Sequence, residues 1–70
     1  MECKLRSEWI ELDNMLKALH LVGSGGEAKQ HILAGAVMVN GEPETRVRRK
    51  LRPGDKVIFN GQEITVAGPE

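Results

Sequence analysis

Two Asn-Gly dipeptides in the second half of the chain constrain its fold more than any other feature. Asn40-Gly41 and Asn60-Gly61 each follow a run of β-favouring residues. Asn-Gly is the dipeptide best suited to a two-residue hairpin turn, because that turn needs positive φ at both central residues. Pro43 cannot donate a ladder hydrogen bond, so the first return strand is expected to be short or at an edge. The strands predicted around these turns are residues 36–39, 56–59 and 62–67.

The first half of the chain has helical periodicity instead. Apolar residues recur with the spacing of one helical stripe, at Leu12, Met15, Leu16 and Leu19. A second helix is expected to begin at Ser24, because Ser24 and Glu27 match a capping box, and to stop at Gly35. Helices this short are not stable alone, so they are expected to pack on each other and on the strands.

The predicted fold class is α+β in a single small domain. Seventy residues leave no room for a second domain. Residues 1–8 mix charge and polarity without a period, so we expect a flexible N-terminal lead-in followed by one domain over residues 9–70. Residues 9–11 are expected to form a short strand before the first helix. The complete layout is two short packed helices followed by a small, mainly antiparallel β-sheet that they cover on one face.

Composition excludes several classes of protein. No apolar run approaches the roughly 18 residues of a membrane span, and charge follows the N-terminus where a signal peptide needs apolar residues. A lone cysteine, Cys3, cannot form an internal disulfide, which favours a reducing compartment. We therefore expect a cytoplasmic protein with no membrane partner.

Residues for catalysis or metal binding are scarce. The candidate nucleophiles and bases lie in no recognised catalytic motif, and they are Ser7, Ser24, Cys3, His20 and His31. One cysteine and two distant histidines do not give the paired spacing of a zinc site. The sequence therefore predicts a protein that is not an enzyme and has no catalytic residues, metal site or cofactor.

The segment RVRRKLR, residues 46–52, carries five cations in a chain of zero net charge, and we call it the cationic segment. If it is extended, Arg46, Arg48, Lys50 and Arg52 point to one face, while Val47 and Leu51 point to the other. A helix would also leave Val47 and Leu51 on one stripe. Guanidinium groups bind phosphate through paired hydrogen bonds, so the segment is a candidate phosphate-binding surface. The alternative is a solvated face balanced by neighbouring acids, namely Glu42, Glu44 and Asp55.

Two further features qualify this site. The only aromatic rings, Trp9 and Phe59, are both expected in the core, so recognition would be of backbone and shape without base stacking. The GSGG stretch lacks the motif of a nucleotide-binding loop. As a helix start with little side-chain bulk, it offers free N–H groups to a phosphate; alternatively, it is only a flexible loop with a cap.

The run from Leu12 to Gly61 resembles the S-four domain, the RNA-binding module named after ribosomal small-subunit protein four. The matching features are Leu12-Asp13, Ser24, Ala28, Ile32, Gly35-Ala36-Val37, Val39-Asn40-Gly41 and Gly54-Asp55. The stretch ETRVRRK and the small size make it most similar to the small stand-alone bacterial members. The resemblance implies RNA contacts from the start of the second helix and from the cationic segment, at Ser24, Gly25, Gly26, Lys29, Gln30, Arg46, Arg48, Arg49 and Lys50; Arg52 extends that segment.

The resemblance implies a non-catalytic monomer that binds structured RNA, ribosomal or ribosome-associated, with the ribosome or its assembly proteins as further partners. Many members carry arginine directly after the helix-two serine, whereas Gly25 stands here, so the cationic segment is expected to carry more of the binding. Two alternatives remain. One is a module that binds an acidic protein, and the other is a β-grasp carrier, although the C-terminus lacks the diglycine of such carriers.

Overall fold

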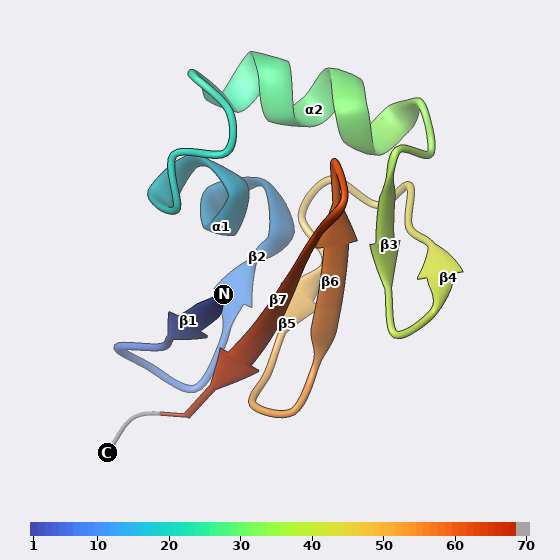
Figure 1. Ribbon diagram of the computed structural model, residues 1–70. Helices are drawn as coiled ribbons and strands as arrows, with labels where there is room; N and C mark the ends of the chain where they lie inside the picture. The colour runs from blue at the N-terminus through green and yellow to red at the C-terminus, as the bar shows by residue number, and fades with distance from the viewer. Residues whose placement is uncertain (69–70) are drawn as a thin grey trace.

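The computed structural model describes residues 1–68 and shows two helices packed over a set of short strands (Figure 1). In chain order the elements are β1 (Glu2–Lys4), β2 (Ile10–Glu11), α1 (Leu12–Ala18), α2 (Gly25–Leu33), β3 (Val37–Val39), β4 (Glu42–Pro43), β5 (Lys50–Leu51), β6 (Lys56–Phe59) and β7 (Gln62–Ala67).

The strands form two sheets. The larger has the order β1-β7-β6-β3-β4, and the smaller pairs β2 with β5. All pairs are antiparallel except β1 with β7, which is parallel. The α+β class and the mainly antiparallel pairing are therefore confirmed. The short strand expected at residues 9–11 is β2, whereas β1 was not predicted.

Both Asn-Gly dipeptides form the predicted turns. Asn40 and Gly41 have φ of 53° and 86°, and Asn60 and Gly61 have φ of 52° and 78°. β4 is two residues long and lies at the edge of the larger sheet, as Pro43 requires. The two hairpins pair β3 with β4 and β6 with β7, and the pairing of β3 with β6 joins them in one sheet.

The second helix begins and ends where the sequence predicts. The Ser24 hydroxyl accepts a hydrogen bond from the Glu27 backbone N–H at 3.2 Å. The Glu27 carboxylate accepts in return from the N–H of Gly23 at 3.0 Å, one residue earlier than in a standard capping box. Gly35, with φ of 77°, lies just beyond the helix end.

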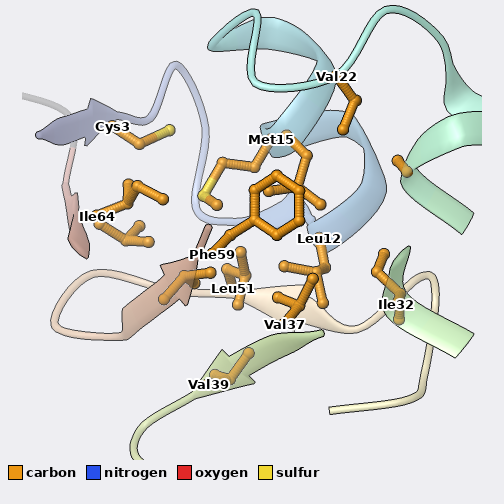
Figure 2. Close-up of a cluster of buried hydrophobic side chains, with 14 of the residues drawn as sticks. Cys3, Leu12, Met15, Val22, Ile32, Val37, Val39, Leu51, Phe59 and Ile64 are labelled. Carbon is orange, nitrogen blue, oxygen red and sulfur yellow. The ribbon is translucent and has the colours of Figure 1, made fainter. Parts of the chain in front are cut away.

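The core lies between the helices and both sheets. Figure 2 shows buried side chains from α1, α2 and the strands of both sheets converging, with the Phe59 ring among them. Leu51 of the smaller sheet is fully buried in this cluster, so the core holds the two sheets and the helices together. Three residues of the predicted helical stripe, Leu12, Met15 and Leu16, are fully buried. The fourth, Leu19, lies just beyond the end of α1 and packs against the core while partly buried.

The prediction of a flexible lead-in over residues 1–8 is wrong for residues 2–5. Residues 2–4 form β1, which pairs with β7 in the register Cys3 to Val66. Cys3 and Leu5 are 5% and 6% exposed and belong to the core. The pairing partner lies more than sixty residues away in sequence, so no local period could indicate it. The folded domain therefore begins at β1 and not at Trp9.

Candidate nucleic-acid interface

The cationic segment is neither one strand nor one helix. It begins three residues after the end of β4, forms a turn at Val47–Arg48 and then enters β5 at Lys50. The N–H of Arg49 donates to the carbonyl of Arg46 at 3.3 Å and closes that turn. The two regular conformations considered from the sequence are thus both incorrect for the whole segment, although its last part is extended.

The predicted division of faces nevertheless holds. Leu51 is fully buried and Val47 is half-buried against the core. The cations on the solvent side are exposed at Arg46, Arg48, Lys50 and Arg52, and half-buried at Arg49. The two apolar residues anchor the segment, so its charges are displayed from a fixed backbone.

The start of α1 fixes the same backbone. The N–H groups of Leu12 and Asp13 donate to the carbonyls of Arg49 and Val47, at 2.9 Å and 3.2 Å. These are N–H groups of the first helical turn, which have no partners within a helix. Glu11, the residue before the helix, supplies no side-chain cap. The turn therefore serves as the cap of α1, and neither can move without the other.

The carboxylate of Glu44 forms ion pairs with two arginines of the segment, Arg46 and Arg49. Its side chain is 9% exposed and accepts from Arg46 Nη2 at 2.8 Å and from Arg49 Nη1 at 3.0 Å. It also accepts from the backbone N–H groups of Thr45 and Arg46. The hydrogen bonds from Arg46 are the main cause that lowers the pKa of Glu44 to about 2, against the opposing effect of burial. From the sequence, Glu44 was expected only to be one of the acids that balance the cations, because its burial depends on the tertiary fold.

All five cations line one shallow hollow in the surface: Arg46, Arg48, Arg49, Lys50 and Arg52. Asp55, one of the acids expected to balance them, uses its carboxylate to accept from the Arg52 N–H at 2.8 Å and from the Asn40 amide at 3.0 Å. Glu44 is the acid that forms ion pairs with members of the group in the part of the chain that the structure describes. The hollow therefore carries a concentrated positive charge on a neutral protein.

Trp9 is not in the core, and this prediction is wrong. Its ring is 37% exposed, and Lys50 Nζ lies over it at 4.7 Å from the centroid. Phe59 is buried as predicted, at 6% exposure. Trp9 lies just before β2. The residues that hold this part of the chain to the core are Ile10 of β2 and Leu12 of α1, so the Trp9 ring is left at the surface. An exposed aromatic ring therefore borders the cationic segment.

The predicted residues of the second helix form a separate group. Ser24 caps α2, and Lys29 and Gln30 are exposed on it. A Cβ built on Gly25 would meet nothing within 4 Å, and one on Gly26 only the Ser24 hydroxyl at 3.9 Å, so this end of the helix is open. Over residues 1–68, no hydrogen bond or ion pair joins this group to the cationic segment. The two halves of the predicted site are thus held by different elements.

Comparison with known proteins identifies the family. A model of the S4 domain, the S-four module of the sequence analysis, matches residues 3–67. The chain belongs to the S4 domain family. Its match begins inside β1, in agreement with a domain that includes this strand.

Individual relatives agree with this assignment. The chain is 42% identical over 55 residues to the probable ribosome maturation protein RlbA of Bacillus subtilis, covering 79% of this chain and 78% of RlbA. It is 40% identical over 57 residues to the putative RNA-binding protein YbcJ of Escherichia coli, covering 81% of both chains. These small relatives confirm the expected similarity to stand-alone members of the family.

The fold agrees as well. The solution structure of E. coli YbcJ, described as revealing an αL motif involved in RNA binding, superimposes with a TM-score of 0.71 at 36% sequence identity. The match covers 94% of this chain and 85% of YbcJ. The arrangement of two helices and short strands is therefore the αL-motif fold.

No group of three or more His, Cys, Asp and Glu side chains in residues 1–68 could hold a metal ion. No helix in the same range is long and apolar enough to cross a membrane.

Proposed function

We propose that this protein binds structured RNA without catalysing a reaction, and that the cationic segment is its main contact surface. The observation that carries the proposal is the hollow lined by five cations. Its backbone is fixed by α1, and two of its arginines, Arg46 and Arg49, are oriented by Glu44. Two relatives support RNA as the ligand of this surface. YbcJ is named a putative RNA-binding protein, and RlbA is named a probable ribosome maturation protein.

The five cations have two roles. Arg46 and Arg49 are held by Glu44, which fixes the direction of their remaining N–H groups. Arg48, Lys50 and Arg52 have no acidic side-chain partner among the described residues. The first pair positions a phosphate with fixed geometry, while the other three supply the charge that releases counterions from the RNA.

The start of α2 supplies the second contact. Its N–H groups and partial positive charge favour a phosphate near Gly25 and Gly26, and Lys29 and Gln30 lie one turn further along the exposed side. Gly25 brings no charge of its own, so this contact is the weaker of the two. Ser24 acts mainly as the cap that keeps the helix start in place.

We further propose a ribosomal or ribosome-associated RNA as target, with the ribosome or its assembly proteins as partners of a monomeric, cytoplasmic protein. RlbA's name connects that relative with ribosome maturation. Phosphate contacts position a protein without reading sequence, so the surface described here selects RNA by shape.

The direct test is the double variant R48Q/R52Q in filter binding to a structured RNA. These residues are exposed and are not used by Glu44, so the fold is expected to stay intact. If each neutralises one phosphate, the variant should bind roughly 25- to 60-fold more weakly at about 0.1 M salt, since each contact contributes about 0.7 to 0.9 log units there.

The matched control is K17Q/K56Q, which removes two exposed cations from α1 and β6. It changes the net charge equally but leaves the hollow complete. Equal losses in the two variants would show that bulk charge and not this surface binds RNA. If wild type binds no RNA and instead retains an acidic protein after RNase treatment, the proposal is replaced by the protein-interaction alternative.

A further inference from the structure

A second hollow lies beside the cationic segment and has a different character. Its volume is about 530 Å³, within the roughly 300–1,000 Å³ of small-ligand sites. Apolar side chains of Leu5, Ile10 and Leu19 line it, together with the Trp9 ring, while Arg6 and Ser7 add polar groups. Its lining residues come from β1, from the loop that joins β1 to β2, from the start of β2 and from the end of α1.

Pairing of β2 with β5 joins this hollow to the cationic segment. Ile10 lies opposite Leu51, and Lys50 of the same strand reaches over the Trp9 ring. The Ser7 hydroxyl donates to the carbonyl of Trp9 at 3.0 Å and holds the loop that carries the ring. The indole is therefore a wall shared by a positively charged surface and an apolar hollow.

We propose that this hollow takes one unpaired nucleobase of the bound RNA, stacked on the indole of Trp9. The inference rests on the proposed function, because the cationic segment holds the RNA from which that base extends. The base lies on the ring face away from Lys50, while the Lys50 ammonium remains over the other face, next to the phosphates.

The chemistry of the hollow matches a nucleotide better than a purely apolar ligand. A base needs a π-surface and an apolar floor, which Trp9 and Leu5 supply. The phosphate of the same nucleotide needs a cation. Arg6 lines the hollow and Lys50 lies over the Trp9 ring, so both are available. Apolar and cationic groups thus occur together on the scale of one nucleotide.

Trp9 itself reports on stacking, because it is the chain's one tryptophan and the chain has no tyrosine. The experiment compares three RNAs built on one hairpin: fully paired, with a single unpaired adenosine in the stem, and with an abasic nucleotide at that position. All three should bind through the cationic segment. Only the hairpin with the unpaired adenosine should quench the indole fluorescence. Equal quenching by the abasic hairpin would overturn the proposal, since no base would then be involved.

Variants give an independent readout. W9L should weaken binding of the adenosine-bearing hairpin by about five- to a hundredfold, as for loss of one stacked base, and leave the abasic hairpin unaffected. W9F should retain most of the affinity. If W9L does not fold, as judged by circular dichroism, the quenching measurement on wild type still decides the question.

The two proposals fail differently. Binding of all three hairpins with no selective quenching and no selective loss in W9L overturns the stacking site alone. Absence of binding to any of them, or binding that R48Q/R52Q leaves unchanged, overturns the proposed surface and the stacking site with it.

Discussion

Glu44 shows how a single residue shapes a surface of opposite charge. A carboxylate among five cations lowers their total charge, yet it orients two guanidinium groups and also accepts two backbone N–H groups of the chain that follows β4. An arginine that is already oriented loses less freedom when it binds phosphate. The cost in charge is one unit, and the gain is a defined geometry.

Replacing this carboxylate should therefore affect both folding and binding. We expect E44Q to lower the free energy of unfolding by roughly 1–3 kcal/mol, because the amide has no charge and keeps only one acceptor oxygen for the hydrogen bonds from Arg46 and Arg49. Urea denaturation of E44Q and wild type measures this. E42Q is the control, because Glu42 is exposed on the edge strand β4. Equal midpoints for E44Q and wild type would contradict the organising role.

The same residue predicts an acid-dependent loss of stability. The pKa of Glu44 is lowered from 4.5 to about 2 in the folded protein, chiefly by hydrogen bonds from Arg46. A carboxyl whose pKa is depressed by folding stabilises the fold above its unfolded pKa, and this contribution is lost as the pH falls towards the folded pKa. Wild type should thus lose the Glu44 contribution between about pH 5 and pH 2. The difference in stability between wild type and E44Q should shrink over that interval; a constant difference would exclude Glu44 as its source.

At the level of secondary structure, we expect the stability of α2 to depend on its N-terminal cap, Ser24. S24A removes the hydroxyl that accepts from the Glu27 N–H and should cost about 0.5–2 kcal/mol. In a domain of this size that is a large share of the total stability. S7A is the matched control, since the Ser7 hydroxyl donates only within the β1–β2 loop. A loss no larger than in S7A would show that the cap is not needed for the helix.

The second contact surface can be tested by adding a charge. A Cβ on Gly25 meets nothing within 4 Å, and Gly25 has no positive φ, so G25R fits without strain. If the start of α2 faces RNA, G25R should bind about five- to eightfold more tightly at roughly 0.1 M salt, the value of one phosphate contact. G25Q separates the charge from the added side chain. Unchanged affinity in G25R would remove the helix start from the interface.

Some elements are predictable from local sequence and others are not. β6, β7 and both hairpin turns follow from Asn-Gly geometry and alternation, and α2 follows from its cap. β1 was missed because it pairs with β7 across nearly the whole chain. The conformation of the cationic segment was missed because the turn is set by α1 and Glu44, which are tertiary contacts. Its residues were predictable from composition, whereas its shape was not.

At the scale of the whole molecule, positive charge is concentrated on one surface although the net charge is zero. The chain has ten basic and ten acidic residues, and half of the basic ones line a single hollow. A polyanion close to the hollow interacts mainly with the five nearby cations, because salt screens charges that lie more than about 10 Å away. The net charge of the whole protein therefore matters less than this local charge. A neutral protein can thus bind phosphates without a strong general attraction to every polyanion.

This sorting predicts the salt dependence of RNA binding. If Arg48, Lys50 and Arg52 each neutralise a phosphate, the slope of log K against log salt should be about −2 to −3, at roughly 0.7 to 0.9 per contact. The slope should be steeper if Arg46 and Arg49 also reach phosphates. R48Q/R52Q should make it shallower by about one and a half units, whereas K17Q/K56Q should leave it close to wild type.

R48Q/R52Q should bind unrelated structured RNAs more weakly than wild type by the same factor, because contacts to phosphate carry no sequence information. Filter binding of two such RNAs across a salt series, with circular dichroism as the folding control, tests both statements. Arg48 and Arg52 are the residues to replace, because replacing Arg46 would also remove its ion pair with Glu44. A loss of stability could then be mistaken for a loss of RNA contacts. A wild-type slope in R48Q/R52Q would mean that the cationic segment is a solvated face, and RNA binding would then have to depend on α2 alone.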